Sequence, residues 1–198
     1  MNLEETAMTT AYPLYDPQME HESCGVGAVI DLRAQATHRT VSDALTIVER
    51  LAHRAGSDAT GTTGDGVGIL TRLPHALFAR WAAEAGVSLG GEGEYAVGMF
   101  FLPDDEIAVE NICRIFDSLA AAEGLRVLLW RDVPCHPELL GALARRSMPR
   151  IRQCFLARPR DAACEEAFDR RLYILRRQFE KQQTDAYVCS LSCRTIVY

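Results

Sequence analysis

Long apolar runs are missing from this chain of 198 residues. No stretch approaches the ~18 consecutive apolar residues that a membrane-spanning helix needs, so we expect no membrane partner. Excess positive charge is missing too, because 21 Lys and Arg face 27 Asp and Glu and the net charge is -6. Since phosphate binding requires a basic face, we do not expect nucleic acid as a partner.

The chain also lacks a disulfide framework and a secretory signal. Its seven cysteines are odd in number and irregular in spacing, which is typical of a reducing compartment. Residues 1–23 begin with acidic Glu4 and Glu5 and contain no apolar core segment. These features predict a cytoplasmic protein. No cysteine or histidine pair has zinc-like spacing, so we expect no metal site.

Strands and helices interleave in a pattern that predicts an α+β protein with one core, and 48% of the residues are hydrophobic. No glycine-rich dinucleotide loop follows a strand. Helical spacing and capping residues predict helices at 41–52 (capped by Thr40 or Ser42), 74–85, from Asp104 or Asp105 to about 123, 137–145 and 161–182. Apolar runs predict strands at 25–32 (buried), 66–73, 94–102, 125–130, 150–156, 187–191 and 194–198.

Cys24 is the most informative residue, and residues 20–27 around it read EHESCGVG. If residues 1–23 are a leader that is removed, Cys24 carries both a thiol and a free α-amine. Such an amine has a pKa of about 7.7–8.0 and can act as a base near neutral pH, whereas an amide nitrogen cannot. A nucleophile paired with its own N-terminal amine is an established catalytic arrangement. The alternative, favoured by composition alone, is a buried cysteine at the start of a strand.

Seven ordered blocks carry a family resemblance that runs from about residue 12 to the last residue. They are YDPQ to CGVG at 15–27, LAHR at 51–54, TGDGVGIL at 63–70, GEYAVGM at 93–99, LWRDVP at 129–134, RLYILR at 171–176 and SLSCRTIVY at 190–198. With these blocks the chain resembles the first domain of glutamate synthase large subunits. That domain is a class II glutamine amidotransferase of the N-terminal-nucleophile (Ntn) hydrolase type.

The resemblance implies a fold and a division of the chain. The fold is the Ntn four-layer αββα sandwich, and residues 24–198 would be the N-terminal part of the amidotransferase domain, after a leader at 1–23. The β-branched and aromatic run at 195–198 stops without a turn or polar cap. We therefore expect the sandwich to be incomplete at its C-terminus.

The resemblance also implies a reaction and its partners. Cys24 would attack the side-chain amide of glutamine, release ammonia and leave a thioester that water hydrolyses to glutamate. In the complete enzyme the ammonia would reach 2-oxoglutarate at an FMN site. An iron–sulfur cluster would lie in later domains, and a reductase subunit using NADPH, or ferredoxin, would supply electrons. No cofactor is expected in this chain itself, whose partners would be glutamine and the remaining glutamate synthase domains.

Arg54 is the second site residue that the resemblance implies, as the arginine of the family's His-Arg-Gly motif near the nucleophile. Here the motif reads His53-Arg54-Ala55-Gly56, with the glycine displaced by one place. An alanine would be costly at Ala55 if the backbone there needed a positive φ. Without the resemblance, Arg54 is a solvated cation at the C-terminal end of a helix.

Two other motifs have more ordinary interpretations. The Gly-rich loop at 63–66 is predicted to be a structural turn in preference to a substrate contact. Cys189 and Cys193, four residues apart, would point to one side of a strand, and we favour core cysteines over a metal or redox pair.

Two alternatives to the glutaminase remain open at this point. The chain could be an inactive truncated remnant or accessory chain that only binds a partner, or an Ntn relative that acts on another amide, such as a peptidase. The blocks beyond Cys24 argue against the peptidase.

We predict that this chain, once residues 1–23 are removed and Cys24 is its first residue, releases ammonia from glutamine at a negligible rate. The resemblance implies oxyanion donors from an Asn-Gly pair, and substrate-binding residues beyond Tyr198. The chain has only Asn2 and Asn111, and neither precedes glycine. Losing one oxyanion donor typically lowers the rate by about 10²–10³. Ammonia release at the rates of complete amidotransferases would contradict this prediction.

Overall fold

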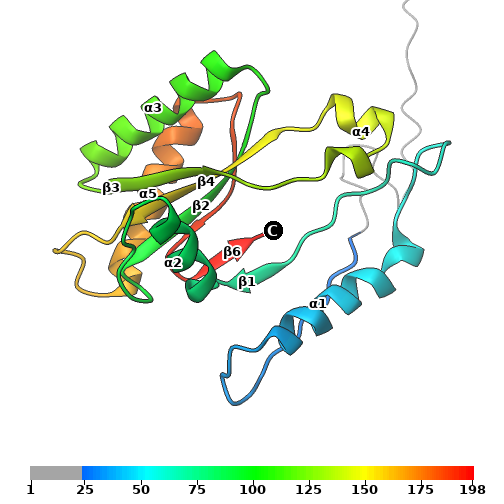
Figure 1. Ribbon diagram of the computed structural model, residues 1–198, viewed down its shortest axis with the longest axis horizontal. Coiled ribbons are helices and arrows are strands. Elements are labelled where there is room, and N and C mark those ends of the chain that lie inside the picture. Colours follow the sequence, from blue (N-terminus) through cyan, green and yellow to red (C-terminus); the bar gives the residue numbers. More distant parts are fainter. Residues whose placement is uncertain (1–23) are drawn as a thin grey trace, which may run out of the picture.

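The computed structural model describes residues 24–198 and shows helices packed on antiparallel sheets (Figure 1). This arrangement confirms the α+β class. The α-helices are α1 (His38–Arg50), α2 (His75–Glu84), α3 (Glu106–Ala122), α4 (Ala142–Arg146) and α5 (Glu165–Gln182), with 3₁₀ turns η1 (Ala52–Arg54) and η2 (Pro137–Leu139). The strands are β1 (Leu70–Arg72), β2 (Tyr95–Leu102), β3 (Arg126–Asp132), β4 (Arg150–Ala157), β5 (Tyr187–Ser192) and β6 (Thr195–Val197).

A four-stranded sheet in the order β3-β4-β2-β5 forms the centre of the molecule. β2 pairs antiparallel with β4 on one side and β5 on the other, and Val97 lies opposite Phe155. All residues of β2 except Phe101 are buried. The nearly continuous apolar sequence of β2 is therefore explained by cover on both faces of the sheet.

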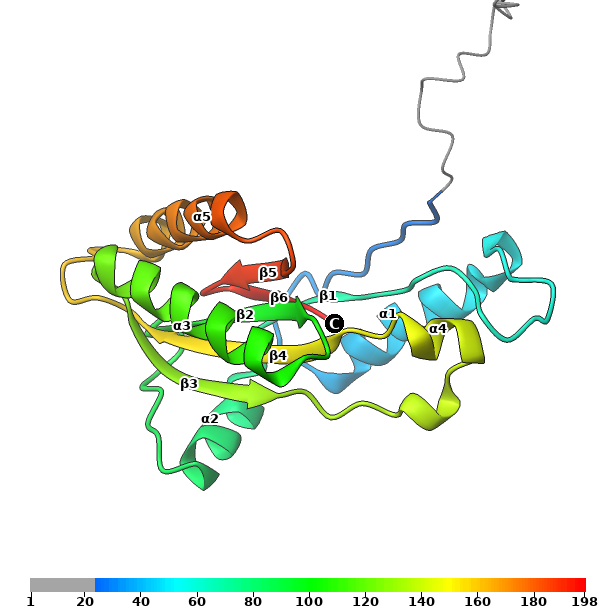
Figure 2. The same cartoon turned by 90° about the horizontal axis from the view of Figure 1, so that it is seen from above.

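Helices α3 and α5 cover the first face of this sheet (Figure 2). The core there is built around Phe100 of β2, Phe116 of α3, Trp130 of β3 and Phe179 of α5. The ring of Phe100 meets the other three edge-on, at centroid distances of 4.9, 5.0 and 5.9 Å. Edge-to-face contacts of this kind add to the stabilisation that burial of the rings provides.

The second face is covered by α2 and by the small antiparallel sheet of β1 and β6. Phe78 of α2 packs edge-on against Phe155 at a centroid distance of 5.3 Å, and Ile196 of β6 is wholly buried beside them. Helix α1 contributes no buried residue to either core and lies apart from the large sheet (Figure 1).

The predicted buried strand at 25–32 is wrong. The segment has no regular secondary structure and pairs with no strand among the described residues, and Val26, Ile30 and Leu32 are 88, 78 and 98% exposed. An apolar run becomes a strand only where a neighbouring strand can satisfy its backbone N–H and C=O groups. None of the strands described here lies beside it.

Several predicted boundaries also need correction. α1 begins at His38, not 41, because the hydroxyl of Thr37 caps the helix by accepting from the Thr40 N–H at 3.4 Å. The strand at 66–73 is reduced to Leu70–Arg72, and the long helix begins at Glu165, not 161. The predicted cap at Asp105 is confirmed, since its carboxylate accepts from the Ala108 N–H at 2.7 Å.

The predicted helix at 137–145 is divided into η2 and α4 at Gly141. A Cβ at Gly141 would lie 2.5 Å from the carbonyl oxygen of Thr62, so only glycine permits this approach to the 56–64 loop. Within residues 24–198, no helix combines the length and hydropathy that a membrane crossing requires.

Asp169 of α5 forms hydrogen bonds with the turn between β5 and β6, where the chain passes from one sheet to the other. Its carboxylate accepts from the Cys193 N–H at 3.0 Å and the Ser192 hydroxyl at 3.2 Å, and pairs with Arg194 at 2.8 Å. Burial raises the pKa of Asp169, but the hydrogen bonds from Cys193 and Arg194 outweigh burial and leave that pKa below its ordinary value.

We predict that Asp169→Asn lowers the free energy of unfolding at pH 7 by about 1–2 kcal/mol, because a charged acceptor of several hydrogen bonds is lost. A lowered folded-state pKa contributes stability above the unfolded value of about 3.9, and this contribution disappears as the pH falls through the folded value. The difference between parent and variant should therefore shrink below about pH 4. Urea unfolding at pH 7 and pH 3 measures both effects.

Asp161→Asn is the matched control, since Asp161 pairs with Arg171 at 2.5 Å on the surface and its side chain is 68% exposed. This variant should unfold like the parent at both pH values, because exposed ion pairs contribute little. Equal destabilisation by the two substitutions would contradict the role given to Asp169.

Candidate functional site

Cys24 is exposed and begins an irregular segment that runs beside α1 (Figure 1). Two glycines allow the segment to pack closely against the helix. A Cβ at Gly25 would lie 3.1 Å from Cδ2 of Leu51, and a Cβ at Gly27 would overlap the side chain of Ile47. The contacts of the two glycines therefore place the Cys24 thiol near the C-terminal end of α1.

Arg54 lies at the end of η1, the turn that follows α1 directly. Its backbone N–H donates to the carbonyl of Leu51 at 2.9 Å, the residue against which Gly25 packs. The structure thus brings Cys24 and Arg54 to the same end of α1. Within residues 24–198, no hydrogen bond or ion pair joins their side chains, and their roles stay predictions.

The displaced glycine of the His-Arg motif causes no backbone strain. Ala55 has φ -78° and ψ 138°, an extended conformation that any residue adopts. The cost considered for an alanine at this position therefore does not arise.

The loop at 55–65 closes on itself. The carboxylate of Asp65 accepts from the Gly56 N–H at 2.7 Å, and the Asp65 N–H donates to the Gly56 carbonyl at 3.1 Å. Asp58 accepts from the Thr60 hydroxyl at 2.8 Å, and this bond, with those from neighbouring N–H groups, holds the pKa of Asp58 below its usual range. Because these bonds are internal, the loop has the contacts of a structural turn. Its left-handed residue is Gly61, with φ 67°.

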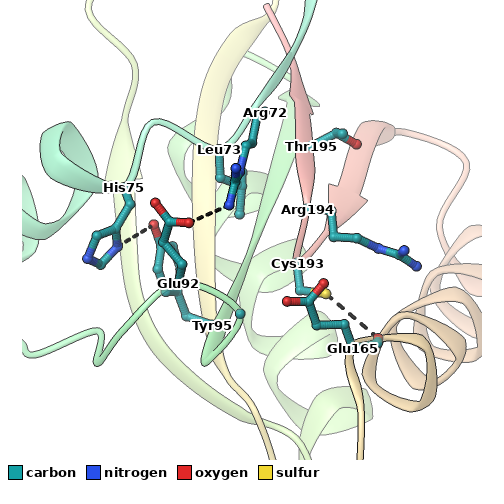
Figure 3. Close-up of a pocket in the computed structure, with 10 residues that line it drawn as sticks. Arg72, Leu73, His75, Glu92, Tyr95, Glu165, Cys193, Arg194 and Thr195 are labelled. Atoms are coloured by element: carbon teal, nitrogen blue, oxygen red, sulfur yellow. Dashed lines mark hydrogen bonds and ion pairs between the residues drawn. The ribbon is translucent and has the colours of Figure 1, made fainter. Parts of the chain in front are cut away.

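A cavity of about 270 Å³ lies between the β1–β6 sheet and the beginnings of β2 and α5 (Figure 3). In it Arg72 forms an ion pair with Glu92, and Nδ1 of His75 lies 3.3 Å from the hydroxyl of Tyr95. Burial raises the pKa of Tyr95 to about 12. The lining residues come from distant parts of the sequence, so no local motif indicates this cavity. It contains neither Cys24 nor Arg54.

The cysteines differ in reactivity because they differ in burial. Burial raises the pKa of the Cys193 thiol, which borders the cavity, to about 12, and raises the pKa values of Cys113, Cys154 and Cys189 as well. Because the thiolate is the nucleophile, these four are poor nucleophiles at neutral pH. Cys24 and Cys164 are the exposed cysteines.

The expectation that Cys189 and Cys193 share one side of a strand is wrong. Cys189 lies in β5 and packs against the core of the second face, whereas Cys193 lies beyond the end of β5 and is buried in the core of the first face. Across residues 24–198, no group of three or more His, Cys, Asp or Glu side chains is arranged to hold a metal ion.

Comparison with known proteins identifies a family that this chain matches. Residues 24–198 match the family model of class-II glutamine amidotransferases. The chain is 38% identical over 180 residues to ferredoxin-dependent glutamate synthase 2 of Synechocystis, covering 90% of this chain and 12% of that protein. It is 35% identical over 195 residues to the NADPH glutamate synthase large chain of Bacillus subtilis, covering 96% of this chain and 13% of that one. The chain therefore spans about an eighth of the length of these relatives.

We predict that Gly27→Ala loosens the segment that carries Cys24, because the new methyl group overlaps the side chain of Ile47. Amide hydrogens of α1 should exchange faster, as measured by mass spectrometry. Gly66→Ala is the control, because no atom lies within 4 Å of a Cβ there. Adding Ile47→Ala to Gly27→Ala removes the overlap and should slow the exchange again. Equal exchange in all variants would refute the packing described for Gly27.

Proposed function

This chain belongs to the class-II glutamine amidotransferases, and we propose that it is the glutaminase portion of a glutamate synthase with Cys24 as its nucleophile. The observation that carries the proposal is the start of the family match at Cys24 itself. Its support is the exposure of this thiol, in contrast to the four cysteines whose pKa values burial raises. The reductants named for the relatives differ, so the proposal leaves the electron donor open.

The proposed reaction has two steps. The Cys24 sulfur attacks the side-chain carbonyl of glutamine, and the thiol proton passes to the α-amine once Cys24 is the first residue. The carbon–nitrogen bond breaks, ammonia leaves with that proton, and a thioester remains. Water then attacks the thioester, releases glutamate and restores the thiol.

Arg54 is proposed to support the geometry around Cys24 without forming a bond to the substrate. This proposal is supported by the position of η1, which directly follows Leu51, the residue whose side chain packs against Gly25.

The remaining layers of the fold are part of the same proposal. We propose that the β3-β4-β2-β5 sheet is an inner layer of a four-layer αββα sandwich and that residues 24–198 are the N-terminal part of that domain. The hydrophobic cores on both faces of the sheet support its assignment as an inner layer. The leader proposed at 1–23 lies outside the described residues.

For the complete enzyme, we propose that the ammonia is transferred to 2-oxoglutarate in domains that contain FMN and an iron–sulfur cluster. Among residues 24–198, no three potential metal-binding side chains assemble, so the described residues do not fit an iron–sulfur cluster. The proposed compartment is the cytoplasm, on the cysteine pattern alone. A second candidate, an accessory chain without activity, is favoured by the lack of an Asn-Gly pair.

We predict that removing residues 1–23 speeds alkylation of Cys24 by iodoacetamide at pH 7. The new α-ammonium group lies next to the thiol and favours the thiolate, because an opposite charge lowers a thiol pKa. The rate should rise by about tenfold for each unit by which the thiol pKa falls towards pH 7. Mass spectrometry of the digested protein gives the rate for each cysteine separately.

Cys164 is the matched control in the same sample, because it is exposed and lies at the N-terminal end of α5, far from residue 24 in the sequence. Its alkylation rate should be the same with and without residues 1–23. An unchanged Cys24 rate, or an equal increase at Cys164, would rule out activation of this thiol by its own amine.

A further inference from the structure

A polar cluster lies on the second face of the sheet and takes no part in the chemistry proposed for Cys24. It consists of Arg131 of β3, Gln153 of β4, Trp81 of α2 and Tyr198, which follows β6. Arg131 and Gln153 are neighbours in the register of β3 and β4. None of the four lines the cavity of Figure 3.

Arg131 is a half-buried cation without a paired carboxylate. Its guanidinium carbon lies 3.6 Å from the centre of the Trp81 ring, and one N–H donates to Oε1 of Gln153 at 2.8 Å. Within residues 24–198, no carboxylate lies within salt-bridge distance of it. Glu84 acts on it electrostatically from farther away but pairs with Arg80 at 4.0 Å. A cation removed from water in this way is costly unless an anion compensates it.

Gln153 provides a second, independent sign of a missing acceptor. Its side chain is wholly buried, and its Nε2 meets no acceptor with good hydrogen-bond geometry among the described residues, although the amide acts on the hydroxyl of Tyr198. The other end of the amide is fixed by the bond from Arg131, so the two Nε2 hydrogens face away from that bond. A buried donor without a partner destabilises a folded protein, because it loses its hydrogen bond to water.

Tyr198 marks where an anion would be favoured. Burial raises the pKa of this phenol, whereas the amide of Gln153 and the charge of Arg131 act in the opposite direction. Both donors thus favour negative charge at the position of the phenol oxygen, although the phenol itself stays neutral at pH 7. Tyr198 is 41% exposed, so its ring can move aside for a stronger acceptor.

We infer that Arg131 and Gln153 form a binding site for a carboxylate group, supplied either by a small organic acid or by an Asp or Glu side chain of another polypeptide segment. Arg131 offers a planar fork that matches the two oxygens of a carboxylate. The contact with Trp81 holds this fork flat, so little conformational freedom is lost on binding. The buried amide of Gln153 gains the acceptor that it lacks in the free protein.

Titration with sodium acetate, followed by tryptophan fluorescence, tests the inference, because Trp81 contacts the guanidinium group directly. Sodium chloride keeps the ionic strength constant. A second titration uses the peptide acetyl-Gly-Glu-Gly-amide, whose one carboxylate is a side chain. We expect saturable binding with a dissociation constant of about 10 mM or tighter for at least one of the two probes. Tighter binding of the peptide assigns the site to a polypeptide carboxylate, and equal or tighter binding of acetate assigns it to a small acid.

Substitutions of Arg131 and Gln153 test whether these two donors bind the carboxylate. Arg131→Gln, which removes the charge, and Gln153→Glu, which supplies an internal carboxylate to Arg131, should each weaken binding by about tenfold or more. Arg131→Lys keeps the cation without the fork, should weaken binding by a similar factor, and carries the test if Arg131→Gln does not fold. Arg126→Gln is the control, because Arg126 is exposed at the other end of β3, and should bind like the parent.

Thermal unfolding of each variant verifies that it is folded before titration. The inference is overturned if neither probe gives a saturable signal with the parent protein. It is also overturned if folded Arg131→Gln or Arg131→Lys binds as tightly as Arg126→Gln.

Discussion

The pairing of β2 with β4 and β5 is the constraint on which the rest of the structure depends. β2 is covered on both faces, so its backbone groups have to be satisfied by the two neighbouring strands. Successive side chains of a strand point to opposite faces. When Phe100 enters the core under α3 and α5, Met99 must therefore enter the core under α2, and a slip of one residue would exchange the two sets.

The same constraint decides what the polar residues of β3 and β4 meet. Arg152 of β4 lies on the first face, where its Nε is 3.3 Å from a carboxylate oxygen of Asp132 and its guanidinium lies 5.6 Å from the ring of Trp130. Arg131 of β3 lies on the second face and stacks on a tryptophan in the same manner, but meets no carboxylate among the described residues. The two arginines thus differ in their distance to the tryptophan ring and in the presence of a counter-ion. This difference is the reason why we infer a carboxylate site on the second face.

Local sequence signals predicted those elements that depend on local interactions. The apolar run of β2 and the cap at Asp105 are examples, since each is decided within a few residues. The segment at 25–32 has an equally apolar sequence, but its state depends on whether another strand lies beside it, which the segment itself does not encode. The bond between Asp169 and Cys193 joins residues 24 positions apart and has no local signature. Cys24 and Arg54 were found through family resemblance, and their geometry adds proximity to one helix end but no assignment of roles.

The role proposed for Cys24, that of a nucleophile, agrees with a position outside the sheet. Cys154, in the middle of β4, is wholly buried, and that burial raises the pKa of its thiol because a thiolate there would lack water. A thiol that reacts at neutral pH has to stay in contact with solvent, and the segment of Cys24 accordingly has no strand partner among the described residues. Its position then depends on side-chain packing against α1, at Leu51 and Ile47. Helix α1 buries no residue of its own in the two cores, so its contribution lies in positioning this segment more than in stabilising the sheet.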